Sequence, residues 1–465
     1  MKNRSNKSTF AVLIAVLFLT GCSMTPTYER PEVSTPAWKN DEVSQAVQIA
    51  SDWWKGFGSD ELNTFMEQAL NYNNDLRASL HRIEQSRAEL QIAGASLLPS
   101  ASVTAGTMNG PRQAFNITDR RRHGVPNYTA DAGISYELDL FGANRADIEA
   151  NEASLLGSHY AHEALALIVM GDVAQGYFNV VNLRERRRIA KDNVISVQDL
   201  LKVVEARFQN GSVTALDVTQ QETVLSNAKA ELASIEQKLA LAENSLAVVV
   251  GQPPQTIDVS GKSLGNINVP QMVVLQPSEL LERRPDIRKA EADLVAANAN
   301  IGAAKAAYFP SINLGSNLLF AADPSASALA LFSAISAPIF QGGRLEGGLK
   351  RAEGRQAELV ENYKKSILVS FQEAEDALAK VKTTKKREAA LRQSVAKSRK
   401  AYDIAKQQYQ LSAVDFQTVL NAQQTMLRAQ DNHARARFET LSASIDLFKS
   451  MGGGWNSHNK QEGKQ

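Results

Sequence analysis

The residue best placed to do chemistry in this chain is Cys22, the only cysteine among 465 residues. It follows a basic start with Lys2, Arg4 and Lys7, and then an apolar run over residues 10–19. That run is shorter than the ~20 residues a membrane-spanning helix needs, so it predicts the core of a signal peptide over residues 1–21. With no second cysteine, the chain forms no intramolecular disulfide and no thiol-based metal site.

The sequence LTGC at residues 19–22 resembles a bacterial lipoprotein signal. That resemblance implies cleavage before Cys22, an S-diacylglycerol on its sulfur and an N-acyl chain on the new amino terminus. Several acyl chains give durable anchoring where one does not. Ser23, where inner-membrane retention needs Asp, implies the outer membrane. The alternative is an ordinary secretory signal with a chance cysteine.

The rest of the chain carries no pattern of a catalytic site. There is no GxSxG elbow, P-loop, HExxH motif or cluster of histidines at metal-ligand spacing, so we expect no enzyme activity, no metal and no cofactor besides the lipid. The chain has 51 Lys and Arg against 50 Asp and Glu, so it has no strong positive electrostatic field that would favour binding to nucleic acid. No run of 18 or more apolar residues follows the signal, so any membrane crossing must use strands.

Long helices are predicted by two proline-free stretches, between Pro126 and Pro253 and after Pro338. Both are rich in good helix formers, and each fits two helices with a short turn. A helix from Phe141 to Phe208 would be on the order of 100 Å long. Apolar residues at alternating steps of three and four predict that this helix packs against coiled-coil partners. The alternative is an ordinary amphipathic helix. This stripe is Leu225, Ala228, Leu232, Ile235, Leu239, Ala242, Leu246 and Val249.

The chain is duplicated. Residues 75–78 (DLRA) match residues 286–289 (DIRK), and residues 140–145 (LFGANR) match residues 339–344 (IFQGGR). A unit of about 200 residues therefore occurs twice, in the order helix, extended pair, long helix, long helix.

The extended pairs predict membrane strands. From Tyr128 to Leu140 apolar and polar residues alternate without a break, as in a barrel strand of about 9–11 residues. Its partner is weaker, and the second repeat alternates less cleanly, so a soluble antiparallel sheet is the alternative. We expect strands over residues 99–109, 128–141, 310–320 and 329–340.

Four strands cannot close a barrel, and open edges are not tolerated in hydrocarbon because unpaired backbone groups cost several kcal/mol each. Eight strands leave an interior just filled by side chains, so a conduit needs more. Three copies are the smallest arrangement that leaves a pore. The predicted fold class is mainly α, with a duplicated unit and a trimeric 12-stranded β-barrel that the long helices continue as a tunnel.

Nearly the whole mature chain resembles the TolC-like outer membrane efflux lipoproteins of the OprM branch. The resemblance rests on the order and spacing of several segments: residues 28–31 (YERP), 52–57 (DWWKGF), 136–142 (YELDLFG), 171–178 (GDVAQGYF), 284–291 (RPDIRKAE), 309–311 (FPS) and 338–344 (PIFQGGR). It implies a homotrimer in the outer membrane, with a 12-stranded barrel, a 12-helix coiled-coil tunnel in the periplasm and a mixed α/β equatorial belt. It also implies docking to a periplasmic adaptor and an inner-membrane resistance-nodulation-division pump.

The resulting domain prediction has six parts. They are a signal (1–21), a lipidated segment and equatorial belt (22–60), the first repeat (61–260), an equatorial linker (261–284), the second repeat (285–452) and a polar tail (453–465). Long helices are expected over residues 142–209, 213–250, 342–410 and 414–450.

Strand-to-helix joints are predicted where glycines follow the strands, because glycine reaches backbone angles that other residues reach only at a cost. An arginine one turn into each long helix is expected to fix the joint through a carboxylate or carbonyl partner that the sequence does not name. The joint residues are Phe141, Gly142, Arg145, Gly342, Gly343 and Arg344.

The resemblance implies a constriction near the helix turns, at residues 210–222 and mainly 411–424. Its leucine, aspartate and arginine positions fall on Gln417, Asn421 and Gln424, which all depart from the pattern. Asp415, with Asp217 as its counterpart, is then expected to supply the charge. The alternative is that both aspartates only cap helices. The expected constriction comprises Asp415, Gln417, Leu420 and Asn421, with help from Asp217 and Thr214.

A basic loop joins the first two strands, and it is expected outside the cell. It holds Arg112, Arg120, Arg121, Arg122 and His123, and either binds lipopolysaccharide phosphates or is only solvated. The expected function is a passive outer-membrane channel for drugs or other small toxic compounds. A type I protein-secretion channel, a metal-efflux channel and a lipidated periplasmic adaptor are the alternatives.

Overall fold

The structure is a computed structural model, and it describes residues 23–39, 50–108, 127–261, 263–270, 274–322 and 325–453. Cys22 and the basic residues of the 109–126 loop lie outside the described residues. The chain forms two compact units. Unit 1 comprises Met1–Glu32, Arg82–His159 and Lys289–Lys364, and unit 2 comprises Val33–His81, Tyr160–Arg288 and Lys365–Gln465.

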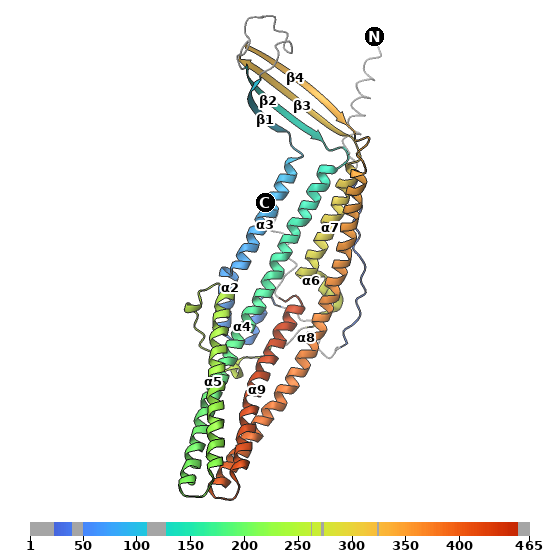
Figure 1. The fold of residues 1–465 in the computed structure, drawn as a ribbon. Helices are drawn as coiled ribbons and strands as arrows, with labels where there is room; N and C mark the ends of the chain where they lie inside the picture. Colours follow the sequence, from blue (N-terminus) through green and yellow to red (C-terminus); the bar gives the residue numbers. More distant parts are fainter. Residues whose placement is uncertain are drawn as a thin grey trace, which may run out of the picture. The chain divides into compact units, whose positions relative to one another are not determined.

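Unit 1 contains an antiparallel sheet of four strands in the order β1-β2-β3-β4 (Figure 1). The strands are β1 (Ser100–Met108), β2 (Asn127–Leu138), β3 (Ser311–Ala322) and β4 (Ser325–Ser336). The two hairpins come from the two halves of the chain and pair through β2 and β3. Within this sheet, β1 and β4 each have one edge without a partner strand.

The sheet has one continuous apolar face. A row across all four strands joins Val103, Ala132, Leu318 and Leu329 in register. Asp131 and its alternating neighbours on β2 project to the other face, because successive side chains of a strand point to opposite sides. The sheet therefore has the two-sided pattern of a wall between hydrocarbon and a more polar interior.

Two strands differ from the sequence expectation. β2 ends at Leu138, before the expected limit at residue 141, because Asp139 bonds to the start of the following helix. β4 begins at Ser325 and ends at Ser336, so it is shifted toward the hairpin relative to the expected 329–340. Pro338 lacks a backbone N–H and cannot donate to a sheet, and Ile339 beyond it is 92% exposed.

The helices repeat their lengths in the two halves of the chain. Helices α3 and α7 each have 22 residues, α4 and α8 each have 67, and α5 and α9 each have 35. The duplication seen in the sequence is therefore a duplication of structure. Their bounds are α3 (Asn74–Ala95), α7 (Pro285–Ala306), α4 (Ala143–Gln209), α8 (Arg344–Gln410), α5 (Ala215–Val249) and α9 (Phe416–Ser450).

The long helices begin one or two residues later than expected, for local reasons. Gly142, Gly342 and Gly343 have φ of +76°, +57° and +84°, which right-handed helix does not allow. Thr214 and Asp415 are N-caps with extended backbone, so α5 and α9 start after them.

Unit 2 has one large hydrophobic cluster, to which the segments expected as belt and linker contribute. Trp53, at the start of η1 (Trp53–Phe57), stacks on Phe448 of α9 with ring centroids 5.1 Å apart. Trp38 donates to the carbonyl oxygen of Leu275 at 2.7 Å. The remaining elements of this unit are α2 (Asp60–Tyr72), η3 (Pro254–Thr256), η4 (Leu264–Asn266) and α6 (Pro277–Arg283).

One apolar stretch departs from the expectation that no helix is apolar enough to span a bilayer. Within the described residues, α4 contains an 18-residue window with a mean hydropathy of 1.5. Of that window, 56% is buried inside the protein. Leu167, Val173 and Phe178 of α4 belong to the unit 2 cluster, so α4 here has the composition of a core helix.

Candidate functional site

Two helical hairpins in unit 2 end in short turns, and these turns form the candidate site. Residues 210–214 join α4 to α5, and residues 411–415 join α8 to α9. A second hydrophobic cluster, here called the tip cluster, packs helices of both hairpins beside the turns. Its buried members are Leu200, Val204, Tyr402, Ala405, Tyr409, Phe416, Val419, Leu420 and Met426.

Both turns leave their first helix in the same way. Gly211 has φ +67°, and the N–H groups of Gly211 and Ser212 donate to the carbonyls of Phe208 and Arg207. Ser412 has φ +59° and, with Ala413, repeats this pair of bonds onto Tyr409 and Gln408. This is the Schellman motif, which glycine usually closes. The second turn thus has the geometry of the first with a serine in the glycine position.

The two aspartates expected to supply charge at the constriction both cap helices. Asp217 accepts from the backbone N–H and the hydroxyl of Thr214, at 2.9 and 2.8 Å. Asp415 accepts from the backbone N–H of Thr418 at 2.8 Å and from its hydroxyl at 2.5 Å. These bonds lower the pKa of Asp415 below its ordinary value of 3.8, and the bond from the Thr418 hydroxyl has the larger effect. The capping role therefore accounts for both carboxylates, and it leaves Asp415 exposed and charged.

The other expected constriction residues divide between surface and core. Gln417 and Asn421 are exposed one turn apart on α9, and the amide of Gln417 donates to Asn421 at 3.0 Å. Gln424 is half-buried. Leu420 is only 5% exposed because it packs in the tip cluster, so its side chain is not presented at the surface of the subunit. In the single subunit, Leu420 therefore contributes to the packing between the hairpins.

Arg207 is the tip residue that the sequence analysis missed. Its Nη2 donates to the carbonyl oxygens of Tyr409 at 2.5 Å and Gln410 at 3.1 Å, and its guanidinium lies 4.1 Å over the Tyr409 ring. Burial raises the pKa of the Tyr409 phenol, and Arg207 opposes that shift. The sequence pointed to Arg207 only through a difference between the two repeats, because the residue at the corresponding position of the second repeat is Gln408.

Two buried amides lie between the helices near the tip cluster. Gln221 and Gln423 are both 0% exposed. Gln221 donates to the carbonyl oxygen of Val197 at 2.9 Å, and Gln423 to the hydroxyl of Tyr402 at 3.4 Å. The side-chain carbonyl oxygen of each has no hydrogen-bond partner among the described residues. An unsatisfied buried acceptor costs about 1–3 kcal/mol, so this part of the packing is not optimised for stability.

The first strand-to-helix joint, in unit 1, is tied by Asp139. Its carboxylate accepts from the backbone N–H of Arg145 at 2.9 Å and from Nε at 3.1 Å, and its carbonyl accepts from Nη2 at 3.0 Å. Asp139 is therefore the partner that the sequence did not name. Phe141 stacks on Phe309 with centroids 4.6 Å apart, which fixes the residue before Gly142.

The second joint is looser. Arg344 donates through Nε to the side-chain oxygen of Gln341 at 2.9 Å, so a neutral amide replaces the carboxylate. Phe340 is 88% exposed, whereas its counterpart Phe141 is stacked. The two copies of the joint thus share glycines with positive φ and an arginine, and differ in the strength of the arginine's partner.

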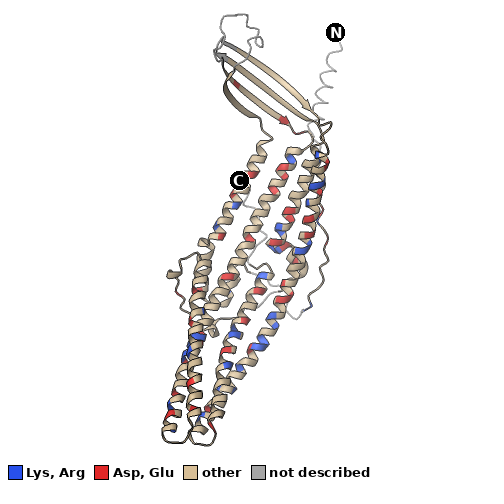
Figure 2. Ribbon diagram, viewed as in Figure 1, with Lys and Arg blue, Asp and Glu red and all other residues tan. Residues whose placement is uncertain are grey.

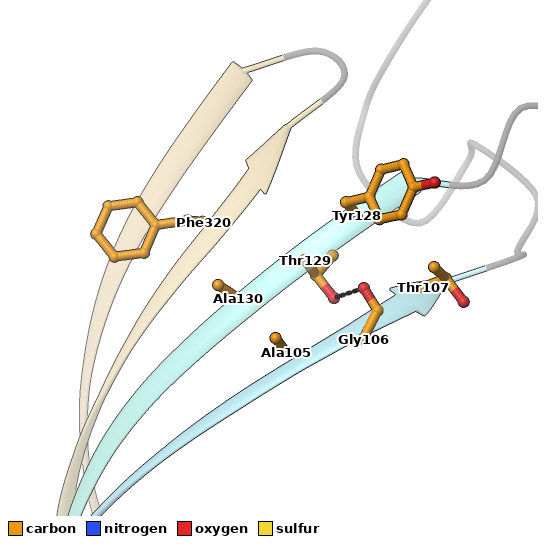
Figure 3. Close-up of a pocket in the computed structure, with 7 residues that line it drawn as sticks. All are labelled: Ala105, Gly106, Thr107, Tyr128, Thr129, Ala130 and Phe320. Carbon is orange, nitrogen blue, oxygen red and sulfur yellow. Dashed lines mark hydrogen bonds between the residues drawn. The ribbon is translucent and has the colours of Figure 1, made fainter.

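The apolar face of the sheet carries a shallow groove of about 640 Å³ (Figure 3). Tyr128 of β2 and Phe320 of β3 project beside it, and Ala105 and Ala130 form part of its floor. Its lining is mostly apolar, and no charged side chain reaches it. Within the described part of the chain, no group of three or more His, Cys, Asp or Glu is placed to hold a metal.

Comparison with known proteins gives one consistent result. The model of the family described as "Outer membrane efflux protein" matches residues 65–252 and 276–453. The chain is 34% identical to the pyoverdine export outer membrane protein OpmQ of Pseudomonas aeruginosa, over 98% of each chain. It is 32% identical to the cation efflux system protein CusC of Escherichia coli, over 78% of this chain and 81% of CusC. Among solved structures, the outer-membrane channel OprN matches with a TM-score of 0.85 and 26% identity, over 93% of this chain and 100% of OprN.

Proposed function

The chain belongs to the outer membrane efflux protein family, and we propose from this membership that three copies form the outer-membrane channel of a tripartite pump. It is a passive conduit from the periplasm to the exterior. It conducts rather than catalyses, and the energy for transport comes from a partner. A periplasmic adaptor and an inner-membrane resistance-nodulation-division pump are the partners.

One observation carries this proposal: a sheet of four strands with two open edges in a chain of the outer membrane. Unpaired backbone groups in hydrocarbon cost several kcal/mol each, so β1 and β4 need strands from other copies. Three copies give twelve strands, which leave a pore where eight do not. The same three copies bring four long helices each, α4, α5, α8 and α9, which make a twelve-helix tunnel.

The membrane anchor is a second part of the proposal. Cys22 carries the S-diacylglycerol and N-acyl chains, and residues 1–21 are removed. The lipoprotein-like sequence around Cys22 supports this, and so does the outer-membrane location of the family. The lipid holds the chain at the membrane before and after the barrel closes.

The constriction lies at the hairpin turns. It comprises Asp415, Gln417 and Asn421, which are exposed on or beside the start of α9, with Asp217 and Thr214 from the first hairpin. A threefold set of carboxylates would hold cations and repel anions. If Asp415→Ala and Asp217→Ala left conductance and cation preference in planar bilayers unchanged, the charged constriction would be wrong.

The transported compounds are small and organic. The similarity to OpmQ, named for pyoverdine export, extends over 98% of this chain, whereas the similarity to CusC, named for cation efflux, covers 78%. Cation export is the second candidate because CusC is a relative at 32% identity. The sensitivity of a deletion strain to metal salts, compared with its sensitivity to organic drugs, separates the two candidates.

The decisive test is drug accumulation in a strain that lacks this gene, has no paralogous channel and expresses the intact pump. We expect accumulation to rise on deletion and to return to normal with the unaltered gene. The Cys22→Ser chain, as a control for anchoring, should restore export only in part. Unchanged susceptibility on deletion would argue against efflux, and a monomer by light scattering in detergent would argue against the trimer.

A further inference from the structure

The groove on the apolar face of the sheet has small residues in its floor and aromatic rings beside it (Figure 3). Ala105 of β1 and Ala130 of β2 are partners in the strand register, and Phe320 of β3 is the partner of Ala130 on the other side. Tyr128 precedes Ala130 by two positions and therefore projects from the same face. The side chains of Tyr128 and Phe320 are 62% and 47% exposed, so both rings stand above the sheet instead of packing within the subunit.

The groove belongs to the first β-hairpin, and the corresponding position of the second hairpin holds a larger residue. Because residues 140–145 match residues 339–344, the counterpart of Ala130 is Leu329. Leu329 lies on the same apolar face, in the row that crosses all four strands, and is 69% exposed. The two hairpins thus present different surfaces on this face, and only the first keeps a small side chain at this position.

The location of the groove indicates what fills it. It lies on the continuous apolar face of the sheet, the face that a barrel strand turns toward hydrocarbon. Tyr128 is near the start of β2, whereas α4 follows the other end of that strand. With the helices in the periplasm, the groove lies in the outer leaflet, which is made of lipopolysaccharide. No charged side chain lines the groove, so it suits a hydrocarbon chain and not a phosphorylated headgroup.

We propose that the groove binds one acyl chain of the lipid A part of a lipopolysaccharide molecule. A floor of two alanines admits a narrow linear chain, and the two rings remove its methylene groups from other surroundings by contact. Tyr128 and Thr107 are partners in the strand register and place hydroxyl groups at one end of the groove. Tyrosine is typical of the level where hydrocarbon meets polar headgroups, so the acyl chain enters beside Tyr128. The inference rests on the proposed function for the orientation of the sheet.

A second copy of this chain meets the sheet at a different place. The outer edges of β1 and β4 lack partner strands, and another strand adds there through backbone hydrogen bonds in the plane of the sheet. The groove opens from the face of the sheet, and it is centred on β2, which is paired on both sides. Closure of a barrel therefore extends the sheet sideways and leaves this face to the membrane.

The test uses the oligomer of the full chain in detergent and purified lipid A added in mixed micelles. Native mass spectrometry counts the lipid A molecules bound per chain. Ala130→Leu, which gives the first hairpin the residue of the second, is compared with Ala132→Leu. Ala132 is the next position on the same face of β2, is half-buried like Ala130, lies outside the groove lining and also has a leucine, Leu331, as its counterpart. Phe320→Ala is a third variant, which removes one wall of the groove without adding bulk.

We expect the unaltered chain to bind one lipid A per chain in a saturable way. The side chain introduced by Ala130→Leu would displace about two methylene groups of the acyl chain, so this variant should weaken binding about tenfold. Phe320→Ala should also weaken binding, because the acyl chain loses its contact with the ring. Ala132→Leu should weaken binding by no more than about twofold, since the added side chain lies outside the groove.

Three results would overturn the proposal. The first is an equal effect of the two leucine variants. The second is lipid A binding that neither Ala130→Leu nor Phe320→Ala alters, as expected if residues 109–126 covered the groove. The third is equally tight binding of phosphatidylethanolamine in the same micelles, which would remove the assignment to lipopolysaccharide. Oligomer size and conductance of the same samples test the proposed function separately. A trimer that conducts but binds no lipid A would refute the lipid site and leave the channel intact.

Discussion

Arg207 of α4 closes the end of α8: its guanidinium donates to the carbonyl oxygen of Tyr409 at 2.5 Å and lies over the ring of the same residue. The last carbonyls of a helix have no donor within the helix, and a cation there also interacts favourably with the helix dipole. One hairpin therefore supplies the cap of the other, which ties the two turns together.

Arg207→Ala should loosen the tip. Hydrogen bonds from a charged donor contribute about 1.5–3 kcal/mol, and the variant leaves the last carbonyls of α8 without this donor. We expect higher single-channel conductance in planar bilayers and a lower thermal midpoint. Arg188→Ala is the matched control, because Arg188 is exposed and, among the described residues, pairs only with Asp192 on its own helix. Equal conductance for the Arg207→Ala and Arg188→Ala channels would show that the contact does not hold the tip.

Gln423→Leu should have the opposite effect on stability. Gln423 is fully buried, makes one long hydrogen bond to Tyr402 and has an unsatisfied carbonyl oxygen. Replacing it with an apolar residue of similar size removes a penalty of about 1–3 kcal/mol. We expect a higher thermal midpoint and a lower conductance, with Gln407→Leu on the exposed side of α8 as control. A drop in the midpoint would mean that the amide has a partner, such as a buried water.

The start of α9 should depend on pH through Asp415. The bonds from Thr418 lower the pKa of this carboxyl in the folded protein, so its contribution to stability is present above the ordinary value of 3.8. The contribution is lost as pH falls through the lowered folded pKa. We expect hydrogen exchange of the first amides of α9 to accelerate in acid. Asp415→Asn should remove this pH dependence, and an unchanged acid profile in that variant would place the titrating group elsewhere.

The two strand-to-helix joints should differ in their sensitivity to mutation. Asp139→Ala removes a carboxylate that accepts two N–H bonds of Arg145, whereas Gln341→Ala removes an exposed neutral acceptor of Arg344. We expect Asp139→Ala to lower the free energy of unfolding by about 1–3 kcal/mol and Gln341→Ala by less than about 1 kcal/mol. Denaturant melts followed by circular dichroism compare the two. A larger loss for Gln341→Ala would contradict the ranking.

Much of the fold could be predicted because the residues that begin and end helices act through their own backbone angles and caps. Figure 2 shows how charged residues are distributed along these helices. Gly142, Gly343 and Asp415 set the starts of helices through backbone angles and caps, and the predicted limits fall within one or two residues of the observed ones. The strands of the second repeat were harder to place, because β4 is apolar on both faces. Phe332, on its nominally polar face, lies against Gly315, where an added Cβ would be 2.2 Å from the ring.

The candidate site was less predictable because it depends on contacts between distant segments. The caps at Asp217 and Asp415 follow from spacing, but the contact of Arg207 with Tyr409 joins residues 202 apart and breaks the internal repeat. Leu420 was expected at the constriction, and its inward orientation depends on which side of α9 meets the tip cluster. Neither the contact of Arg207 with Tyr409 nor the inward orientation of Leu420 can be predicted from the neighbouring sequence.

The unpaired edges of β1 and β4 also affect how the protein is made. Exposed backbone donors and acceptors along a strand can pair with any extended polypeptide, including a second unassembled copy in the wrong register. Each newly exported chain is therefore vulnerable to aggregation until its edge strands pair with those of other copies. The lipid proposed for Cys22 would confine the chains to a membrane plane, raise their effective concentration and shorten that interval, so it would favour biogenesis as well as transport.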